Sequence, residues 1–390
     1  MKSQEYKVLQ VGKFFYPDKG GIESTTKFIF DHFVHDENVN DVLCFKRGKG
    51  SQKIHFGKSF VLKCGTAFQV ASTPISFKFF YWFRKLRNNY DIIHIHSPNP
   101  LAAVALFLFP PKGKVLLHWH SDILTHKFLY LFFRSFEQYL LKRADLILGT
   151  SPVYVQHSPF ISKYDFKANY ISSSTEEANF EVDEERVKEI RNEYDGRKII
   201  FGLGRFIYYK GFEYLIEATK YLPDDFVILI GGAGPMKEKY VSLLKQHDLY
   251  NKIFLLSDIS QKDLGNYYKA CDVFCLPSTE KTEAFGLVLV EAMVFGKPVL
   301  ATNIPGSGTS WVNVNNVTGL NVEPKNSKAL AEGILKIMDQ ENYQTFSVNA
   351  RKRFEEKFTN VKFIDKLKKY YSGLVEPATG LVKQLNKKVI

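Results

Sequence analysis

Short apolar runs typical of buried strands alternate along nearly the whole chain with longer segments typical of helices. The runs cover 7–12, 39–45, 92–96, 115–119 and 146–149, and the pattern restarts with 198–204, 226–230, 253–256, 273–276 and 298–301. This alternation predicts parallel sheets with helices on both faces. Because 390 residues are too many for one core, we expect an α/β protein with two doubly wound, Rossmann-like domains that face a central cleft.

A polar, turn-prone segment, 172–179, separates the two series of runs and is interpreted as the linker. We therefore expect an N-terminal domain over 1–175, a C-terminal domain over 176–355, and a C-terminal segment over 356–390. Within the last part, 354–374 is expected to be helical and the remainder to be a loose tail.

Two glutamates, Glu283 and Glu291, are eight residues apart, and the second lies in an apolar segment, 285–295, that is typical of a buried helix. Burying an ionised carboxylate costs several kcal/mol or more unless it is paired or hydrogen-bonded. The first turn of this helix is expected to include the amides of 284–287. Unpaired backbone N–H groups and the helix dipole at such a start favour binding of an anion. The amides concerned belong to Ala284, Phe285, Gly286 and Leu287. The alternative is a core ion pair for Glu291 and simple capping by Glu283.

Loops rich in glycine or basic residues follow several of the runs. Arg205 and Lys210 follow run 198–204 and offer a guanidinium and an ammonium to a diphosphate. Gly211 stands where a Walker A motif needs Ser or Thr, which disfavours ATP hydrolysis. The pair Gly20 and Gly21, and a second turn that contains Gly234, allow close approach to an anion. Ordinary strand-to-helix turns are the alternative for these glycines.

Histidines end two of the first-half strands. His118 and His120, with Asp122 nearby, could hydrogen-bond a sugar hydroxyl, and Asp122 could orient an imidazole. A metal is the alternative, but no second carboxylate cluster completes a site, so we expect none. His94 and His96 are expected to line the core or an acceptor pocket. Four cysteines without paired ligand spacing predict neither a disulfide nor zinc.

The net charge of +12 is concentrated in the first half. Residues 42–143 carry 16 Lys/Arg against three acids, and basic residues alternate with aromatics in 77–87 and 127–134. This composition suits a helix on an anionic membrane face. Nucleic acid is the competing partner and is not expected; a solvated surface over aromatic core residues is the third alternative. No signal-peptide pattern or run of about 20 apolar residues is found, so we expect a cytoplasmic protein, peripheral at the inner membrane.

These motifs together resemble those of retaining glycosyltransferases of the two-domain GT-B architecture, in family 4, which includes bacterial O-antigen and exopolysaccharide mannosyl- and glucosyltransferases. The resemblance covers nearly the whole chain. The motifs that carry it are 19–23, 118–122, 204–205 with 210–211, 231–235, 283–291 and 296–302. The spaced glutamates together with Arg205 and Lys210 are specific, whereas the glycine turns are not. Ser97 stands where the family often has a carboxylate, so the acceptor side departs from the pattern.

The resemblance implies a role for each candidate residue. Arg205 and Lys210 would hold the donor diphosphate, Glu291 the ribose, and Glu283 the hydroxyls of the transferred sugar. The amides at the start of the 285–295 helix and the glycine turns would complete the donor site, and His120 would contact the donor sugar and help to place the acceptor. The C-terminal helix would return to the first domain.

The expected activity is transfer of a hexose, with mannose favoured and glucose or N-acetylglucosamine as alternatives, from a nucleotide diphosphate sugar to a lipid-linked oligosaccharide. No metal or other cofactor is expected, because fixed cations and helix amides can stabilise the leaving diphosphate. A GT-B nucleotide-sugar epimerase, a sugar phosphorylase, and a non-catalytic nucleotide-sugar-binding or membrane-scaffolding protein are the alternatives. The oligomeric state is not predicted.

Overall fold

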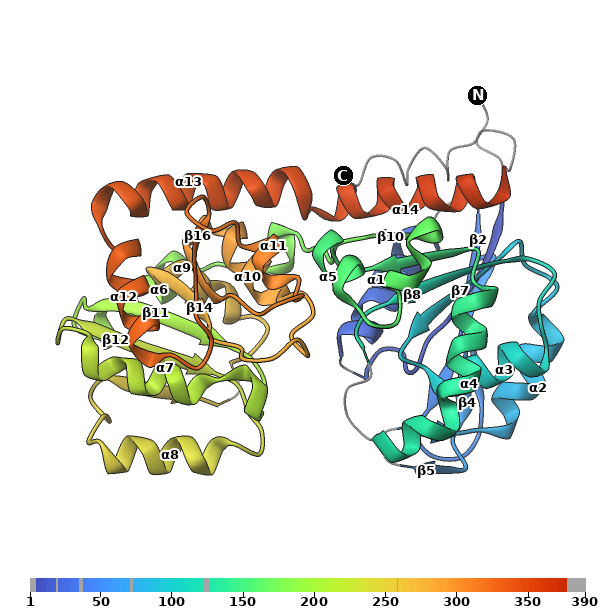
Figure 1. The fold of residues 1–390 in the computed structure, drawn as a ribbon, viewed down its shortest axis with the longest axis horizontal. Helices are drawn as coiled ribbons and strands as arrows, with labels where there is room; N and C mark the ends of the chain where they lie inside the picture. The colour runs from blue at the N-terminus through green and yellow to red at the C-terminus, as the bar shows by residue number, and fades with distance from the viewer. Residues whose placement is uncertain are drawn as a thin grey trace. The chain divides into compact units, whose positions relative to one another are not determined.

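The computed structural model describes residues 5–18, 20–34, 38–70, 73–122, 127–257 and 259–376, without the side chains of 70 and 127–132. By its internal contacts the chain divides into two compact units (Figure 1). Unit 1 comprises 1–171 and 364–390, and unit 2 comprises 172–363.

Unit 1 is built on a mixed sheet with the strand order β10-β9-β8-β7-β1-β2-β4-β3. All neighbours are parallel except β3 and β4, which form an antiparallel hairpin. The strands are β1 (Lys7–Val11), β2 (Val39–Lys46), β3 (Gln52–Phe56), β4 (Ser59–Gly65), β7 (Ile92–Ser97), β8 (Lys114–Trp119), β9 (Leu146–Gly149) and β10 (Ala168–Tyr170). A separate two-stranded sheet joins β5 (Phe68–Val70) and β6 (Thr73–Ile75). The central strands are buried on both faces, which is why most of their residues are apolar; the buried polar residues among them include Gln10, Asn40, His94, His96 and His118.

Helices of unit 1 begin at side-chain caps in several places. Ser76, Asn99 and Ser151 each accept a hydrogen bond from a backbone N–H three residues on, which satisfies one of the unpaired donors at a helix start. The helices are α1 (Gly21–Phe33), α2 (Phe77–Leu86), α3 (Pro100–Leu108), α4 (Lys127–Arg143) and α5 (Pro152–His157), with η1 (Ser162–Lys167). The later part of α14 (Asn360–Val375) also packs in this unit, where Tyr371 contacts Tyr6 and Phe33.

Unit 2 contains a fully parallel sheet with the order β13-β12-β11-β14-β15-β16. Its strands are β11 (Lys198–Leu203), β12 (Phe226–Gly231), β13 (Ile253–Leu256), β14 (Val273–Leu276), β15 (Val299–Thr302) and β16 (Gly319–Val322). Alternate residues of β11 enter two different cores: Ile199 and Phe201 pack in one, and Ile200 in the other. The sheet is therefore covered by helices on both faces (Figure 1).

The helices of unit 2 contribute residues to one or both of these cores. One core contains residues of α6 (Glu184–Glu193), α9 (Leu264–Ala270), α10 (Leu287–Val294), α11 (Thr309–Val312) and α13 (Gln340–Lys357). The other contains residues of α7 (Phe212–Ala218), α8 (Lys237–Gln246) and α12 (Ser327–Ile337). Short 3-10 turns complete the unit: η2 (Glu177–Asn179), η3 (Tyr208–Lys210) and η4 (Thr219–Tyr221).

The α/β class with doubly wound sheets is confirmed, and a strand lies at each of the ten apolar runs. Three expectations were wrong in detail. The sheet of unit 1 is not purely parallel, because β3 is antiparallel. The expected helix at 354–374 is two helices, α13 and α14, interrupted at 358–359, where Thr175 pairs with Thr359. The helix expected over 285–295 is observed over Leu287–Val294. Of the expected tail, 375–390, the part from 377 lies outside the described residues.

None of the helices that the structure describes is both long and apolar enough to cross a membrane.

Candidate active site

The loops after β11 and β14 bring Lys210 and Glu283 together. Lys210 Nζ lies 2.6 Å from Glu283 Oε2, and their side chains are only 11% and 12% exposed. The same oxygen accepts a hydrogen bond of 2.9 Å from Ser278 Oγ, a fully buried residue. Because parallel strands end at one edge of the sheet, residues far apart in sequence meet there. The Lys210 ammonium is thus held against a carboxylate rather than in free solvent.

Gly211 explains how the two loops approach so closely. Its φ is +66°, and a Cβ at this position would lie 2.2 Å from the carbonyl oxygen of Pro277. The contact is extended by a hydrogen bond of 2.8 Å from Thr279 N–H to the Tyr209 carbonyl. A residue with a side chain at 211 would push the two loops apart and separate Lys210 from Glu283.

Glu291 extends from α10 toward α9. Tyr268 Oη donates a 2.6 Å hydrogen bond to Glu291 Oε2, and Tyr268 is fully buried against Phe180, Phe274 and Phe295. Burial raises the pKa of the Glu291 carboxyl, whereas the Tyr268 hydrogen bond and the positive charge of Lys210 act to lower it. One carboxylate oxygen is thereby held, and the other forms no hydrogen bond with any described residue.

The start of α10 offers backbone donors. Gly286 has a φ of +79° and turns the chain sharply into the helix, so Ala284 precedes it instead of opening it. The Ala284 carbonyl accepts from Gly308 N–H at 2.9 Å, and Ser307 Oγ donates to the Glu283 carbonyl. Among the described residues, no hydrogen bond is formed by the N–H groups of 285–287. Such a helix start favours an anion.

The other predicted donor residues lie in exposed or closely packed turns. Arg205 is exposed, and its guanidinium forms no ion pair with any described residue. Gly234 packs against the backbone of Phe206, where a Cβ would come within 2.5 Å of the carbonyl oxygen. A glycine is therefore required at 234 because the turn packs directly against the loop that contains Arg205. In unit 1, Gly20 and Gly21 start α1, and the space above Gly21 is open.

Four histidines form one cluster on β7 and at the end of β8. His94, His96 and His118 are buried. The His120 ring stacks on the His118 ring, with their centroids 4.0 Å apart. Burial lowers the pKa of the His120 imidazole to about 3 and holds the pKa values of the other three well below the ordinary range. The cluster is therefore neutral at physiological pH.

The partners of these histidines differ from the expected ones. His120 Nε2 lies 3.1 Å from His96 Nδ1, whereas Asp122 accepts hydrogen bonds from Trp119 and Ser158. Asp122 thus fixes the loop after β8, and His96 is the hydrogen-bonding partner of His120.

A metal ion could be held by His94, His96 and His118, which each bring a ring nitrogen to within 4.8 Å of the others. Both His96 nitrogens already take part in hydrogen bonds, to His120 and to Gln10. Metal binding would therefore have to break one of these bonds. The expectation that the protein uses no metal stays a prediction.

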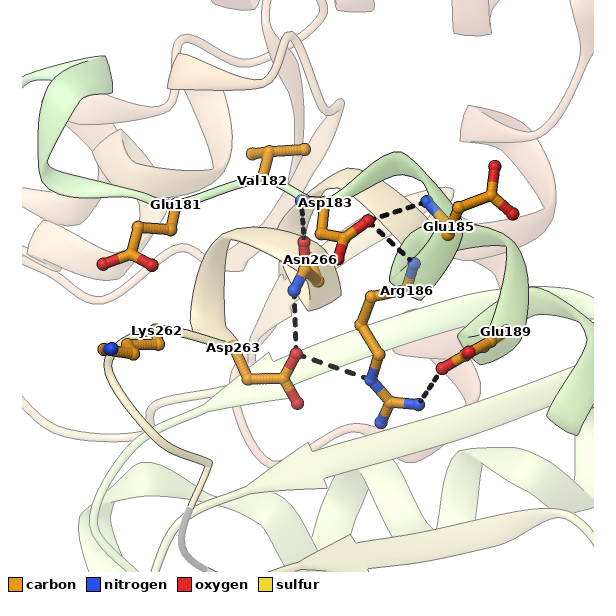
Figure 2. A pocket seen from close by; sticks show the side chains of 9 residues that line it. All are labelled: Glu181, Val182, Asp183, Glu185, Arg186, Glu189, Lys262, Asp263 and Asn266. Carbon is orange, nitrogen blue, oxygen red and sulfur yellow. Dashed lines mark hydrogen bonds and ion pairs between the residues drawn. The ribbon is translucent and has the colours of Figure 1, made fainter.

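A pocket of about 380 Å³ lies between α6 and α9 (Figure 2). Its polar groups largely satisfy one another: Asn266 donates to Asp263, Arg186 lies against Asp263 and Glu189, and Asp183 caps α6. None of the predicted donor residues lines it. The pocket is thus separate from the Lys210, Glu283 and Glu291 group.

Comparison with known proteins identifies the family. A family model described as glycosyl transferases group 1 matches 183–357, and one described as glycosyltransferase family 4 matches 19–157. O-antigen chain mannosyltransferase C of Escherichia coli is 30% identical over 95% of this chain and 99% of its own. D-rhamnosyltransferase WbpZ of Pseudomonas aeruginosa is 26% identical over 82% and 83%.

Solved structures agree on the fold. Anabaena HepE in complex with UDP superposes with a TM-score of 0.73 at 18% identity, over 94% of this chain and all of HepE. Sucrose-phosphate synthase from Thermosynechococcus elongatus gives a TM-score of 0.73 at 19% identity, over 95% and 99%. The architecture is that of a GT-B glycosyltransferase. The chain belongs to the group 1 glycosyl transferases, family 4, as the sequence motifs indicated, and is a glycosyltransferase that uses a nucleotide sugar donor and a sugar acceptor.

Several residues at these sites were missed from the sequence. Ser278 and Ser307 hold Glu283 and its backbone, Tyr268 holds Glu291, and Gln10 contacts His96. Ser278 and Ser307 follow strands and could have been suspected from that position. Tyr268 and Gln10 carry no such signal, because an aromatic in a helix and an amide in a strand are usually structural.

Proposed function

We propose that this enzyme transfers a hexose, with mannose favoured, from a nucleotide diphosphate sugar to a lipid-linked oligosaccharide during assembly of a surface polysaccharide. The observation that carries the proposal is the Lys210–Glu283 pair at the carboxyl ends of β11 and β14, with Glu291 on the adjoining helix. The name of the O-antigen mannosyltransferase relative supports mannose and a polysaccharide pathway.

Donor binding is assigned to unit 2. Lys210 and the exposed Arg205 would bind the diphosphate, and the N–H groups of 285–287 would add neutral donors to it. Glu283 would accept hydrogen bonds from hydroxyls of the transferred sugar, and Glu291 from the ribose. Among the described residues, Glu283 Oε1 and Glu291 Oε1 form no hydrogen bond, so each carboxylate has an oxygen for this purpose.

Bond cleavage places opposite charges on the two products. As the bond from the anomeric carbon to the phosphate oxygen breaks, the sugar becomes positive and the nucleoside diphosphate gains negative charge. Lys210, Arg205 and the α10 amides would stabilise the latter in place of a divalent cation. The acceptor hydroxyl would attack from the face that the phosphate leaves, and the leaving phosphate would take its proton, so that the configuration is retained. The neutral His120 of unit 1 would hydrogen-bond the sugar.

The lipid-linked acceptor implies contact with a membrane, and α2 supports this part of the proposal. Phe77 and Tyr81, one helical turn apart, are 72% and 60% exposed. Lys78, Arg84 and Lys85 are also exposed on this helix. Exposed aromatics bordered by cations suit the anionic inner leaflet of the membrane.

The test is a transfer assay with the full chain, a polyprenyl-linked oligosaccharide acceptor and GDP-mannose, UDP-glucose or UDP-N-acetylglucosamine. We expect mannose transfer with retained anomeric configuration by NMR, and undiminished turnover in excess EDTA. Release of free sugar without transfer, interconversion of nucleotide sugars, or a strict requirement for Mg²⁺ would each contradict the proposal. A His120→Ala or Lys210→Ala variant with normal turnover would contradict the residue assignments.

A further inference from the structure

A row of hydrogen bonds crosses three adjacent strands of the unit 1 sheet and ends at His120, just after a fourth strand. The residues are Asn40 on β2, Gln10 on β1, His96 on β7 and His120 after β8. The strands are neighbours in the order β8-β7-β1-β2. The distances along the row are 2.7 Å, 3.1 Å and 3.1 Å, and the first three side chains are at most 1% exposed.

The direction of each hydrogen bond follows from the atoms that meet. Gln10 Nε2 donates to Asn40 Oδ1, so the Gln10 carbonyl oxygen faces His96 Nε2. An amide oxygen only accepts, and therefore the His96 proton must lie on Nε2. A neutral imidazole carries one N–H, so His96 Nδ1 has a lone pair and accepts from His120 Nε2–H.

The same logic leaves His120 with a lone pair on Nδ1. Burial lowers the pKa values of the His96 and His120 imidazoles, so neither ring takes up a second proton near neutral pH and the hydrogen-bond directions are kept. The nitrogen of His120 that is not directed at His96 is then a hydrogen-bond acceptor. A hydroxyl group that donates is the complementary ligand, whereas a ring or carbonyl oxygen is not.

We propose that Gln10 and His96 are positioning residues that hold His120 as its Nε2–H tautomer, so that its Nδ1 accepts a hydrogen bond from a sugar hydroxyl. The tautomer itself is independent of what the enzyme transfers, while the sugar contact rests on the proposed function. Neither positioning residue needs to touch the substrate, because each acts through the next imidazole in the row.

The test uses full-length protein labelled with ¹⁵N-histidine, and His120→Gln assigns the His120 signals. In wild type at pH 7.5 we expect a protonated Nε2 and an unprotonated Nδ1 for His120. Gln10→Leu removes the acceptor that orders the row, so we expect a mixture of His120 tautomers and a loss of about three- to tenfold in kcat.

Tyr371→Phe is the matched control. Tyr371 Oη lies 2.7 Å from His94 Nδ1, inside the same cluster but outside the row. This variant should keep the wild-type His120 tautomer even if it lowers the thermal midpoint. Protonated Nδ1 on wild-type His120, or equal effects of Gln10→Leu and Tyr371→Phe on the tautomer, would overturn the proposal. If no nucleotide sugar supports transfer, the proposed function fails, whereas the NMR signature still decides the positioning role.

Discussion

Glu283 and Glu291 are held by partners of different charge. Glu283 forms an ion pair with the ammonium of Lys210, while Glu291 accepts a hydrogen bond from the neutral phenol of Tyr268. Removal of Lys210 takes away a charge at the proposed diphosphate position and leaves a nearly buried carboxylate with Ser278 as its remaining partner among the described residues. Removal of the phenol leaves the local charge unchanged. The two residues should consequently affect different steps of the reaction.

Lys210→Ala should lower kcat by about 10²- to 10³-fold, because a fixed donor to the developing charge is lost. Steady-state kinetics with the identified donor measures the change. Lys239→Ala is the control, since Lys239 pairs with Glu213 on the surface of the same unit. Near-normal kcat for Lys210→Ala, with the fold intact by circular dichroism, would remove Lys210 from the diphosphate role.

Tyr268→Phe should weaken nucleoside diphosphate binding about tenfold with a smaller effect on kcat. Without the phenol, the pKa of Glu291 rises further, because the Tyr268 hydrogen bond acts to lower it against burial. A protonated Glu291 is a poorer acceptor for ribose hydroxyls, so binding should weaken further as the pH falls. Calorimetry of UDP and GDP binding measures both effects.

The neighbouring Tyr267→Phe variant controls for general loosening of α9. Tyr267 packs on Phe201 in the same core and is not a partner of Glu291 in any described hydrogen bond. Equal losses in the two variants would show that the packing of α9, and not the Tyr268 hydroxyl, supports binding.

At this scale the sequence predicts candidate residues but not the partners that hold them. Arg205, Lys210 and Glu291 follow strands or interrupt an apolar helix, and both are local signals. The contacts of Tyr268 and Gln10 depend on which strands and helices become neighbours. That information is long-range, and no spacing along one segment contains it.

At the scale of elements, β7 and β8 concentrate neutral histidines. Burial lowers the pKa values of His94, His96 and His118, so they stay unprotonated in the folded state where the unfolded chain binds protons. The unfolded state therefore binds more protons than the folded state at low pH. As a result, the contribution of these histidines to the free energy of unfolding is greatest above the unfolded-state histidine pKa of about 6.5 and falls as the pH drops below it. The contribution of Asp41 to stability has the opposite pH dependence at lower pH, because burial raises the pKa of its carboxyl and the folded state then binds the proton more tightly.

The free energy of local unfolding of β7 and β8 should therefore fall between pH 6.5 and 5. Each histidine contributes about 1.4 kcal/mol per pH unit. Hydrogen exchange of the strand amides measures it. His118→Gln should reduce the slope by the contribution of one histidine, and should leave the pH dependence above pH 7.5 unchanged. A flat profile for wild type in this interval would contradict the neutral cluster.

The predicted elements succeeded where one segment determines its own structure. Apolar runs predicted the buried parallel strands, because both faces of those strands are covered. The exposed β3 strand has no such run, and its pairing with β4 depends on a hairpin at the sheet edge. The break at 358–359 also escaped detection, since Phe358 is buried against Phe285 and Trp311 by tertiary packing. No proline or glycine marks this position.

At the scale of the whole molecule, charge is distributed unequally along the chain. The excess of +12 derives mainly from 42–143, whereas 181–390 carry 30 Lys/Arg and 27 Asp/Glu. Net charge alone would attract any anionic surface. A specific membrane face on α2 requires more, namely that the position of the charges matters at constant net charge.

The final prediction separates these two cases. The triple variant Lys78→Gln, Arg84→Gln, Lys85→Gln should reduce binding to vesicles of phosphatidylglycerol and phosphatidylethanolamine by about 100-fold at low salt, since each cation near an anionic surface contributes about 1 kcal/mol. Phe77→Ser with Tyr81→Ser should also weaken binding, and this loss should persist in high salt, where charge attraction is screened. Cosedimentation measures each.

The matched control moves the same change to unit 2. Lys220→Gln, Lys245→Gln, Lys336→Gln also removes three exposed cations and lowers the formal net charge from +12 to +9. If net charge governs binding, both triple variants lose affinity equally, and the α2 assignment is wrong. If α2 is the membrane face, the unit 2 variant binds almost as wild type does. Transfer to a water-soluble acceptor should then be normal in both, because neither set of lysines and arginines belongs to the donor site.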